Sequence, residues 1–271
     1  FNSIDFFLFF STFFIVYWFV LQKKLEYQNL FIIFSSYIFY AWWDWRFLFL
    51  ILLSTVTDFF CGLKIFSSSS LKNKKMWLYL SLFVNLSLLA IFKYFNFFIE
   101  SWLAIFSTIG IDLNYNSIRI ILPVGISFYT FQTLTYTIDI FKNKIKPTND
   151  FIQFAGFVSF FPQLVAGPIE RAKNLLPQFS SKRSFSIQNL KSGIELIIWG
   201  LFKKVVIADN IAKLVNTVFN DIHSYPAPTI LLAALFFSMQ IYCDFSGYSD
   251  IAIGSARTLG FKMSKNFLCP Y

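Results

Sequence analysis

Charged residues are scarce in this sequence: Asp, Glu, Lys and Arg together make up 14% of its 271 residues. Soluble domains carry about 25% charged and about 45–50% apolar residues. Here 56% of the residues are hydrophobic, 22% are aromatic and the mean hydropathy is +0.60. A water-exposed surface cannot be built from this composition, which excludes a soluble globular protein. The excess apolar area is therefore expected to face lipid.

Residues that bind metals or form disulfides are also scarce. The three cysteines, Cys61, Cys243 and Cys269, are far apart and set in apolar surroundings, so we expect neither a disulfide framework nor a metal site and interpret them as small apolar residues. The single histidine, His223, matches no motif and is interpreted as a solvated loop residue. The sequence has no G-x-S-x-G elbow and no phosphate-binding P-loop, which excludes soluble hydrolases, kinases and metalloenzymes.

Basic residues are present, and they give a net charge of +9. Most lie in or beside four short connectors between apolar runs, which is typical of membrane topology signals and not of nucleic-acid binding. They are Lys23 and Lys24; Lys64, Lys72, Lys74 and Lys75; Lys142, Lys144 and Lys146; and Arg171, Lys173, Lys182, Arg183 and Lys191. By the positive-inside rule, all four connectors are predicted on the cytoplasmic side.

Long apolar runs recur along the chain, and about 20 such residues cross roughly 30 Å of hydrocarbon. The predicted crossings are 4–21, 29–43, 47–66, 76–92, 118–141, 190–212 and 227–243. The first run lacks a preceding basic region and a following cleavage site, so it is interpreted as a span and not as a signal peptide. Residues 41–46 and 93–117 are then predicted outside. The expected fold class is an all-α polytopic membrane protein.

One uncharged run, residues 151–169, contains Pro162, Gly167 and Pro168, which break helices. Both of its ends lie beside basic connectors, so we predict a re-entrant hairpin and not a single span. Such backbone is tolerated at membrane depth only where protein or a water-filled cavity covers it. The candidate site residues near its turns are Gln163, Glu170 and Arg171. A structural loop held by the Glu and the Arg is the alternative.

Polar side chains interrupt two further apolar runs. Residues 122–142 repeat a hydroxyl, amide or carboxyl every three or four positions, which indicates either packing against another helix or a wall that faces a substrate. These side chains are Ser127, Thr130 or Gln132, Thr135 and Asp139. The second run, residues 199–209, contains Lys203 and Lys204. One of them is expected to pair with Asp209, with Glu195 or with a neighbouring helix, and a role in catalysis is the alternative.

The densest polar cluster lies in QIYCDFSGYSDIAIG, residues 240–254, between apolar flanks. Carboxylates and phenols at this density either lock a broken helix or line a polar cavity. The candidate residues are Gln240, Tyr242, Asp244, Ser246, Tyr248 and Asp250.

Five motifs occur in order across residues 118–271: LPVGISFYTFQTLTYTID, FFPQLVAGPIER, GLFKKVVIADN, QIYCDFSGYSDIAIG and NFxxPY. Through them the sequence resembles the membrane-bound O-acyltransferase family, in its bacterial branch that serves alginate O-acetylation. The resemblance implies a ring of tilted helices around a funnel, with an acyl donor reaching it from the cytoplasm and a hydroxyl acceptor from the other side. It implies one membrane domain, with entry helices over 1–117 and the motif region over 118–271.

The resemblance also implies a catalytic histidine, which in this family follows the NFxxPY motif. No catalytic residue is therefore expected in this chain, which begins at Phe1 and ends at Tyr271 and is expected to be an inactive piece of a longer protein. The named polar residues are expected to line the channel and form its hydrogen-bonded network.

The expected function is transfer of an acyl group, most simply acetyl, onto hydroxyls of an exported polysaccharide such as alginate. The donor would be a substrate such as acetyl-CoA, with no permanently bound cofactor and no metal. Expected partners are the lipid bilayer, the polysaccharide and an extracytoplasmic acetyltransferase if transfer is indirect; nucleic acid is not one. The expected location is a bacterial inner membrane. D-alanyl transfer to teichoic acid, and a transporter for a polysaccharide or lipid-linked sugar, are the alternatives.

Overall fold

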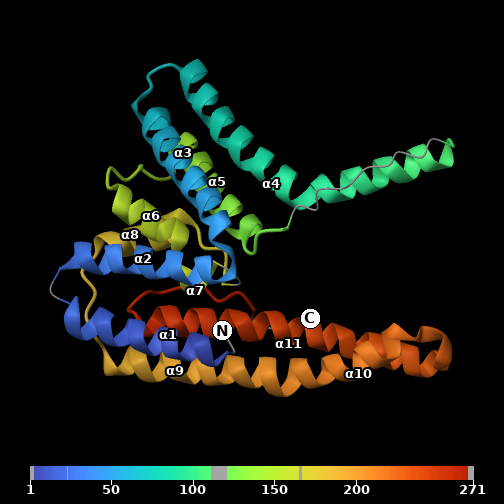
Figure 1. The fold of residues 1–271 in the computed structure, drawn as a ribbon. Helices are drawn as coiled ribbons and strands as arrows, with labels where there is room; N and C mark the ends of the chain where they lie inside the picture. The colour runs from blue at the N-terminus through green and yellow to red at the C-terminus, as the bar shows by residue number, and fades with distance from the viewer. Residues whose placement is uncertain (1–2, 23, 111–120, 165–166, 268–271) are drawn as a thin grey trace.

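The computed structural model describes residues 3–22, 24–110, 121–164 and 167–267, and over these ranges the chain is helical without a β-strand (Figure 1). The α-helices are α1 (Ile4–Ile15), α2 (Leu25–Asp44), α3 (Leu48–Ser67), α4 (Leu71–Thr108), α5 (Ile126–Phe141), α6 (Phe151–Ser159), α7 (Phe161–Leu164), α8 (Ala172–Ser180), α9 (Ile187–Leu201), α10 (Asp209–Asn220) and α11 (Ala227–Thr258). Two π-helical segments, η1 (Val16–Val20) and η3 (Phe202–Ala208), and two 3₁₀ turns, η2 (Trp45–Phe47) and η4 (Ile222–Ser224), complete the described elements. The predicted all-α class is confirmed.

Three stretches of the described chain are long and apolar enough to cross a membrane: Leu25–Ser67, Leu71–Thr108 and Ala227–Thr258. A shorter apolar helix covers Ile4–Val20. Neither of the predicted crossings over 118–141 and 190–212 is both as long and as apolar as these three stretches. Helix α5 has only 16 residues, and the range 190–212 carries five charged side chains. These two crossings stay predictions.

Helix α4 differs from the sequence prediction, which separated a crossing over 76–92 from a mixed segment over 93–117. The structure joins them in one helix of 38 residues, Leu71–Thr108. At about 1.5 Å per residue such a helix is longer than the roughly 30 Å hydrocarbon layer. In Figure 1 its second half bends and projects away from the other helices. Residues 111–117 of the predicted segment lie outside the described residues.

The connections that carry the basic residues lie toward one side of the molecule. Figure 1 shows the α1–α2, α5–α6 and α8–α9 connections on the left and the α3–α4 connection at the upper left, with the α10–α11 turn at the far right. The placement of the four basic connectors on one side of the membrane stays a prediction. At the opposite end of α2, Asp44 and Arg46 form an ion pair of 2.6 Å within the tight turn that leads into α3.

The predicted break in residues 151–169 is present. Asp150 caps α6 by accepting hydrogen bonds from the backbone N–H groups of Ile152 and Gln153, and the helix ends at Ser159 before the short α7 begins at Phe161. Nine residues of α6 extend about 14 Å, too little to cross a bilayer. Every residue from 154 to 164 is buried in protein. A broken helix at membrane depth needs such cover, because its free backbone N–H and C=O groups cannot form hydrogen bonds with lipid. The depth of this segment in the membrane stays a prediction.

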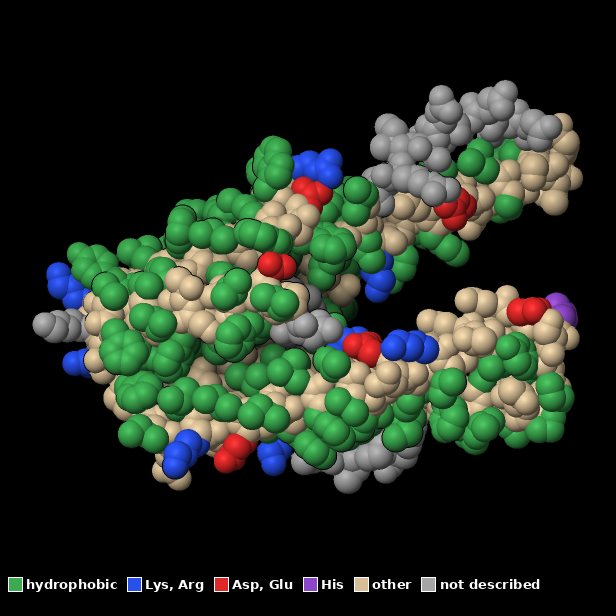
Figure 2. All heavy atoms as spheres, turned by 60° about the horizontal axis from the view of Figure 1, so that its bottom comes forward, with side chains coloured by type: hydrophobic (Ala, Val, Ile, Leu, Met, Phe, Trp, Pro, Cys, Tyr) green, Lys and Arg blue, Asp and Glu red, His purple; other side chains and the backbone are tan. Residues whose placement is uncertain are grey.

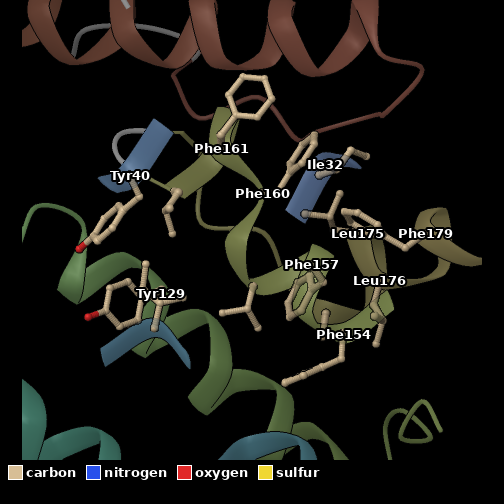
Figure 3. Packing of buried hydrophobic residues seen from close by; sticks show 14 of the residues in the cluster. Ile32, Tyr40, Tyr129, Phe154, Phe157, Phe160, Phe161, Leu175, Leu176 and Phe179 are labelled. Carbon is tan, nitrogen blue, oxygen red and sulfur yellow. The ribbon is translucent and has the colours of Figure 1, made fainter. Parts of the chain in front are cut away.

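Aromatic rings surround this broken helix (Figure 3). The ring of Phe160 lies 5.8 Å from that of Phe179 in α8 and 4.6 Å from that of Phe261, which follows α11. On the other side, Phe161 lies 5.1 Å from Phe13 of α1. Edge-to-face and tilted pairs at these distances add to the free energy gained by burying the rings. The core of the protein is therefore built around α6 and α7.

Helices α9 and α11 pack antiparallel through four glycines. A Cβ atom on Gly200 would lie 2.5 Å from the carbonyl oxygen of Gly247, and a Cβ atom on Gly254 would lie 2.5 Å from that of Gly193. The two glycines of each helix are seven residues apart, so they fall on the same face. Small residues at such positions let helix backbones approach closely. The stretch from α9 into the start of η3 therefore runs in direct backbone contact with α11.

Candidate functional site

Two consecutive lysines of η3, Lys203 and Lys204, contact α11 next to the glycines at which α9 and α11 cross. Nζ of Lys203 lies 2.5 Å from a carboxylate oxygen of Asp250 and 2.9 Å from the hydroxyl of Ser246. Lys204 takes the other side, where its Nζ lies 2.6 Å from a carboxylate oxygen of Asp244. Asp244 and Ser246 lie on opposite sides of Gly247 around the helix. The two consecutive lysines therefore contact α11 on both sides of this glycine.

The second lysine has further partners. Its Nζ lies 2.9 Å from a carboxylate oxygen of Asp209 and 5.1 Å from the ring centre of Tyr248. We call the set held by the two lysines the lysine cluster: Lys203, Lys204, Asp209, Asp244, Ser246, Tyr248 and Asp250. Of the two sequence interpretations, the structure supports pairing, both with Asp209 and with a neighbouring helix. Glu195 is not a partner in any ion pair of the described residues.

The local backbone explains how both lysines reach α11. Residues Phe202–Ala208 are π-helical, and the wider turn of a π-helix changes the direction of the side chains that it carries. Such segments are frequent at functional sites. A Cβ atom at Gly247 would lie 2.8 Å from the carbonyl oxygen of Gly200 and 3.2 Å from the backbone nitrogen of Lys204, so the backbone would have to shift to accept a larger residue there. The GLFKK and DFSGYSD motifs are therefore two halves of one contact.

The lysine cluster is open on one flank. The side chains of Asp244 and Asp209 are 39% and 41% exposed, whereas those of Lys203 and Lys204 are 13% and 14% exposed. Three carboxylates face two ammonium groups, so the cluster can accept hydrogen bonds from a further donor on its exposed flank. Hydroxyl groups of a sugar are donors of this kind.

Two other candidates of α11 lie beside the cluster. The ring of Tyr242 lies 6.0 Å from that of Phe267 in edge contact, which places the start of the NFxxPY motif against the QIYCDFSGYSD motif. The side-chain oxygen of Gln240 is buried and has no hydrogen-bond partner among the described residues. The remainder of the NFxxPY motif, residues 268–271, lies outside the described residues. All six α11 candidates thus lie within one stretch of this helix, residues 240–250.

The three hairpin candidates are placed differently. Gln163 is buried on α7, where its side-chain oxygen accepts a hydrogen bond of 3.4 Å from Gln132 of α5. Glu170 is 1% exposed and accepts hydrogen bonds from the backbone N–H and the hydroxyl of Ser264. Arg171 begins α8 and is exposed. The alternative of a loop held jointly by the Glu and the Arg is not seen in the described contacts, because Glu170 holds the segment after α11 instead.

That segment, residues 259–267, forms a strap that leads from the end of α11 back to its middle. Arg183, 5% exposed, stacks on Phe261 at 4.8 Å and donates a hydrogen bond of 2.6 Å to the side-chain oxygen of Asn29. Burial lowers the pKa of the Arg183 guanidinium from its ordinary value. Trp18 and Tyr17 of η1 donate hydrogen bonds to the carbonyls of residues 258 and 259. The strap therefore joins Glu170 to the neighbourhood of Tyr242.

One member of the polar stripe of α5, Gln132, packs against another helix. Nε2 of Gln132 donates a hydrogen bond of 2.7 Å to the carbonyl of Phe157 in α6, and the hydroxyl of Thr135 bonds back to its own helix. Gly125, with φ of 77°, precedes α5 in a left-handed conformation that glycine adopts without strain. The carbonyl of Val124 accepts a hydrogen bond from Tyr40. Gln132 thus ties α5 to α6, and the roles of Ser127, Thr135 and Asp139 stay predictions.

A second polar cluster was not predicted from the sequence. Its centre is Asp58 of α3, 0% exposed, which accepts hydrogen bonds from Asn85 and Ser81 of α4 at 2.8 and 2.6 Å. We call its members the Asp58 cluster: Ser54, Asp58, Ser81, Asn85, Thr133 and Thr137. The only available signal was a carboxyl and an amide inside apolar runs. No ion pair involves Asp58 in the described part of the chain, so this cluster joins α3, α4 and α5 through neutral donors.

The remaining predictions concern the cysteines and the histidine. Cys61 and Cys243 are free and buried, as expected of small apolar residues, and Cys269 lies outside the described residues. His223 is exposed in the turn before α11, as predicted, and is visible at the far right of Figure 2. Among the described residues no group of three or more His, Cys, Asp or Glu side chains could hold a metal ion.

Comparison with known families gives one match over most of the chain. The profile of the MBOAT, membrane-bound O-acyltransferase family, matches residues 38–270. Among curated proteins, the Probable alginate O-acetylase AlgI of Pseudomonas putida is 37% identical over 271 residues, which are 100% of this chain and 55% of that protein.

Two further relatives differ in the polymers that their names state. The Peptidoglycan O-acetyltransferase of Helicobacter pylori is 35% identical over 283 residues, covering 94% of this chain and 53% of that protein. The Teichoic acid D-alanyltransferase of Bacillus subtilis is 28% identical over 156 residues, covering 55% of this chain and 38% of that protein. The chain spans about half the length of the first two of these relatives.

Proposed function

The chain belongs to the membrane-bound O-acyltransferase family, and on that premise we propose that the whole protein transfers acetyl groups onto hydroxyls of an exported polysaccharide. The observation that carries the proposal is the match of the entire chain to the alginate O-acetylase, at 37% identity. The peptidoglycan relative extends the same reaction to a second polymer. The proposed acceptor class is therefore a bacterial polysaccharide, with alginate as its first example.

In this proposal the lysine cluster forms part of the wall along which the acceptor lies. The exposed carboxylates of Asp244 and Asp209 accept hydrogen bonds from sugar hydroxyls, and the lysines hold these carboxylates in place. Gln240 and Tyr242 extend the same wall along α11. No proton transfer is assigned to these residues, since each acts by binding and orientation.

The hairpin candidates have a supporting role in the proposal. Glu170 fixes the strap through Ser264, and Gln163 ties α7 to α5. Both are positioning residues that maintain the channel next to α11. Arg171 belongs to the basic connectors on the proposed cytoplasmic side, where a soluble acyl donor such as acetyl-CoA would arrive. The proposed setting is the inner membrane of a bacterium, and transfer is either direct or through an extracytoplasmic acetyltransferase.

The experiment that tests the function uses the full-length gene in a host that lacks its own polymer O-acetyltransferase. Acetyl esters are measured on the secreted polysaccharide and on peptidoglycan, with the empty vector as the control. The proposal expects acetyl esters on one of these polymers only when the gene is present. D-alanyl esters on teichoic acid would support the weaker relative's reaction instead. A change in the amount of secreted polymer without any ester would support a transporter.

A further inference from the structure

A cavity of about 650 Å³ lies between α1 and α2, away from the lysine cluster. Its volume falls within the range of about 300–1,000 Å³ that is typical of small-molecule sites. The two helices run antiparallel, since Phe6 packs on Phe39 at 5.9 Å and Phe13 packs on Phe31 at 4.9 Å. Large rings and not small residues thus separate the two helices. This spacing leaves a groove between them.

The floor of the groove is aromatic. The lining rings of Phe13 and Phe39 pack on the buried Phe161 of α7, whose ring lies 5.1 Å from that of Phe13 and 5.8 Å from that of Phe39. The broken helix therefore supports the groove directly. Any molecule in the groove would in turn cover the rings that pack on α7.

The walls open outward onto apolar surface. Phe34 is 64% exposed and Leu8 is 59% exposed, and both line the cavity. These residues belong to Leu25–Ser67 and Ile4–Val20, the apolar stretches of the N-terminal part of the chain. The groove is thus continuous with the surface that faces lipid. In the membrane this surface contacts the hydrocarbon tails of the lipids. An open groove of aromatic and aliphatic side chains therefore fits a hydrocarbon chain as its ligand.

One end of the groove is polar. The N-terminus of α1 contributes Ser3 and Asp5, and the C-terminal part of α2 contributes the exposed indoles of Trp42 and Trp43. Tryptophans gather where the hydrocarbon layer meets the headgroups. This end is opposite the basic α1–α2 connector and so is placed on the outer side by the positive-inside rule. Among the described residues that line the cavity, Asp5 is the only charged one.

We propose that the groove between α1 and α2 binds one acyl chain of an amine-bearing phospholipid of the outer leaflet. The chain lies along the aromatic floor toward Phe13, and the headgroup lies at the end that carries Asp5 and the two tryptophans. A single carboxylate at this end favours a headgroup with an ammonium over one with only a phosphate. The bound lipid is then a structural ligand that supports α7 from the side opposite the lysine cluster.

The test uses the full-length protein in nanodiscs that contain a phosphatidylethanolamine with a photoactivatable acyl chain. Labelled peptides are mapped by mass spectrometry after illumination. We expect label to concentrate on residues 4–15 and 31–43. Ile38→Trp, which fills the groove, should lower this label several-fold, because Ile38 lines the cavity. Phe83→Trp is the matched control, since Phe83 is 70% exposed on α4 and outside the groove. It should leave the label unchanged.

A second variant keeps the test decisive if Ile38→Trp does not fold. Asp5→Asn should reduce the preference for the phosphatidylethanolamine probe over a phosphatidylglycerol probe with the same chain, because it removes the one charge of the lining. Gel filtration checks that each variant is monodisperse. Label spread equally over α1, α2 and α4 would contradict the proposal. So would an unchanged pattern in folded Ile38→Trp, an unchanged preference in Asp5→Asn, or protection of the groove by another protein segment.

Discussion

The Asp58 cluster and the lysine cluster both place carboxylates among apolar helices, but they are built in opposite ways. Asp58 is 0% exposed and is held by neutral donors from α4. Asp244 is 39% exposed and is held by an ammonium group. A sealed network in which every member is satisfied fixes the packing of helices. A charged network with an open flank keeps capacity for a ligand. The difference separates a structural tie from a binding wall.

The largest expected effect comes from breaking the backbone contact that creates the lysine cluster. Gly200→Leu would place a side chain where the carbonyl of Gly247 already lies 2.5 Å from an added Cβ. Overpacking usually costs about 1–3 kcal/mol and here cannot be relieved by a rotamer change. We expect loss of monodisperse protein in detergent, measured by gel filtration.

The matched control for this change is Ala234→Leu, on an exposed position of α11. It should leave the elution profile as in the parent. Equal behaviour of the two variants would contradict the account of the glycine crossing.

A smaller loss of stability is expected when the sealed cluster is broken. Asp58→Leu leaves Asn85 and Ser81 without their acceptor, and each unsatisfied buried group costs about 1–3 kcal/mol. Asp58→Asn keeps the shape and one acceptor and should cost less. Thermal unfolding of the purified protein should rank the parent, the Asn variant and the Leu variant in that order. An unfolding temperature for Asp58→Leu equal to that of the parent would show that the cluster is not a structural tie.

Coupling within the lysine cluster is the next effect in size. Lys204 has two carboxylate partners, Asp209 and Asp244, so either Asp→Asn change leaves it with one. Because both carboxylates are partly exposed, each single change should cost about 0.2–1 kcal/mol. The double variant removes both partners and should cost more than the sum, with a coupling of about 0.5 kcal/mol or more. A double-mutant cycle of unfolding free energies checks this. Strict additivity would show that the two carboxylates act independently.

The smallest effect is expected at Arg171, which is exposed at the start of α8. Arg171→Ala should change the unfolding temperature by no more than the scatter of the measurement, because surface substitutions usually stay within about 0.5 kcal/mol. Arg183→Ala is the comparison, since it removes a buried cation that stacks on Phe261 and bonds to Asn29. If both variants lowered the unfolding temperature equally, the conclusion that Arg183 holds the strap in place would be wrong.

The sequence predicted the helical class, the break before α7 and an ion pair at Lys203 or Lys204, for which it left Asp209, Glu195 and a neighbouring helix open as partners. These features depend on local signals: apolar runs, prolines, and charges near one another in sequence. It did not predict the Asp58 cluster, because Ser54, Asn85 and Thr133 lie on three different helices and meet only in the fold. The contact of Glu170 with Ser264 was not predicted for the same reason, since the two residues are 94 positions apart in the sequence. The sequence prediction ended the crossing at residue 92, whereas the helix α4 continues to Thr108, because Lys93 interrupts the apolar run without interrupting the helix.

The measurement that tests the central claim most directly compares the two clusters in the full-length protein. Polymer acetylation and the amount of protein in the membrane are determined for Asp244→Ala, Tyr248→Phe and Asp58→Asn. The account predicts that the first two lower acetylation while the protein level is kept, and that Asp58→Asn changes acetylation only as far as it changes the protein level. Unchanged acetylation at unchanged protein level in both Asp244→Ala and Tyr248→Phe would contradict the assignment of the lysine cluster to the acceptor wall.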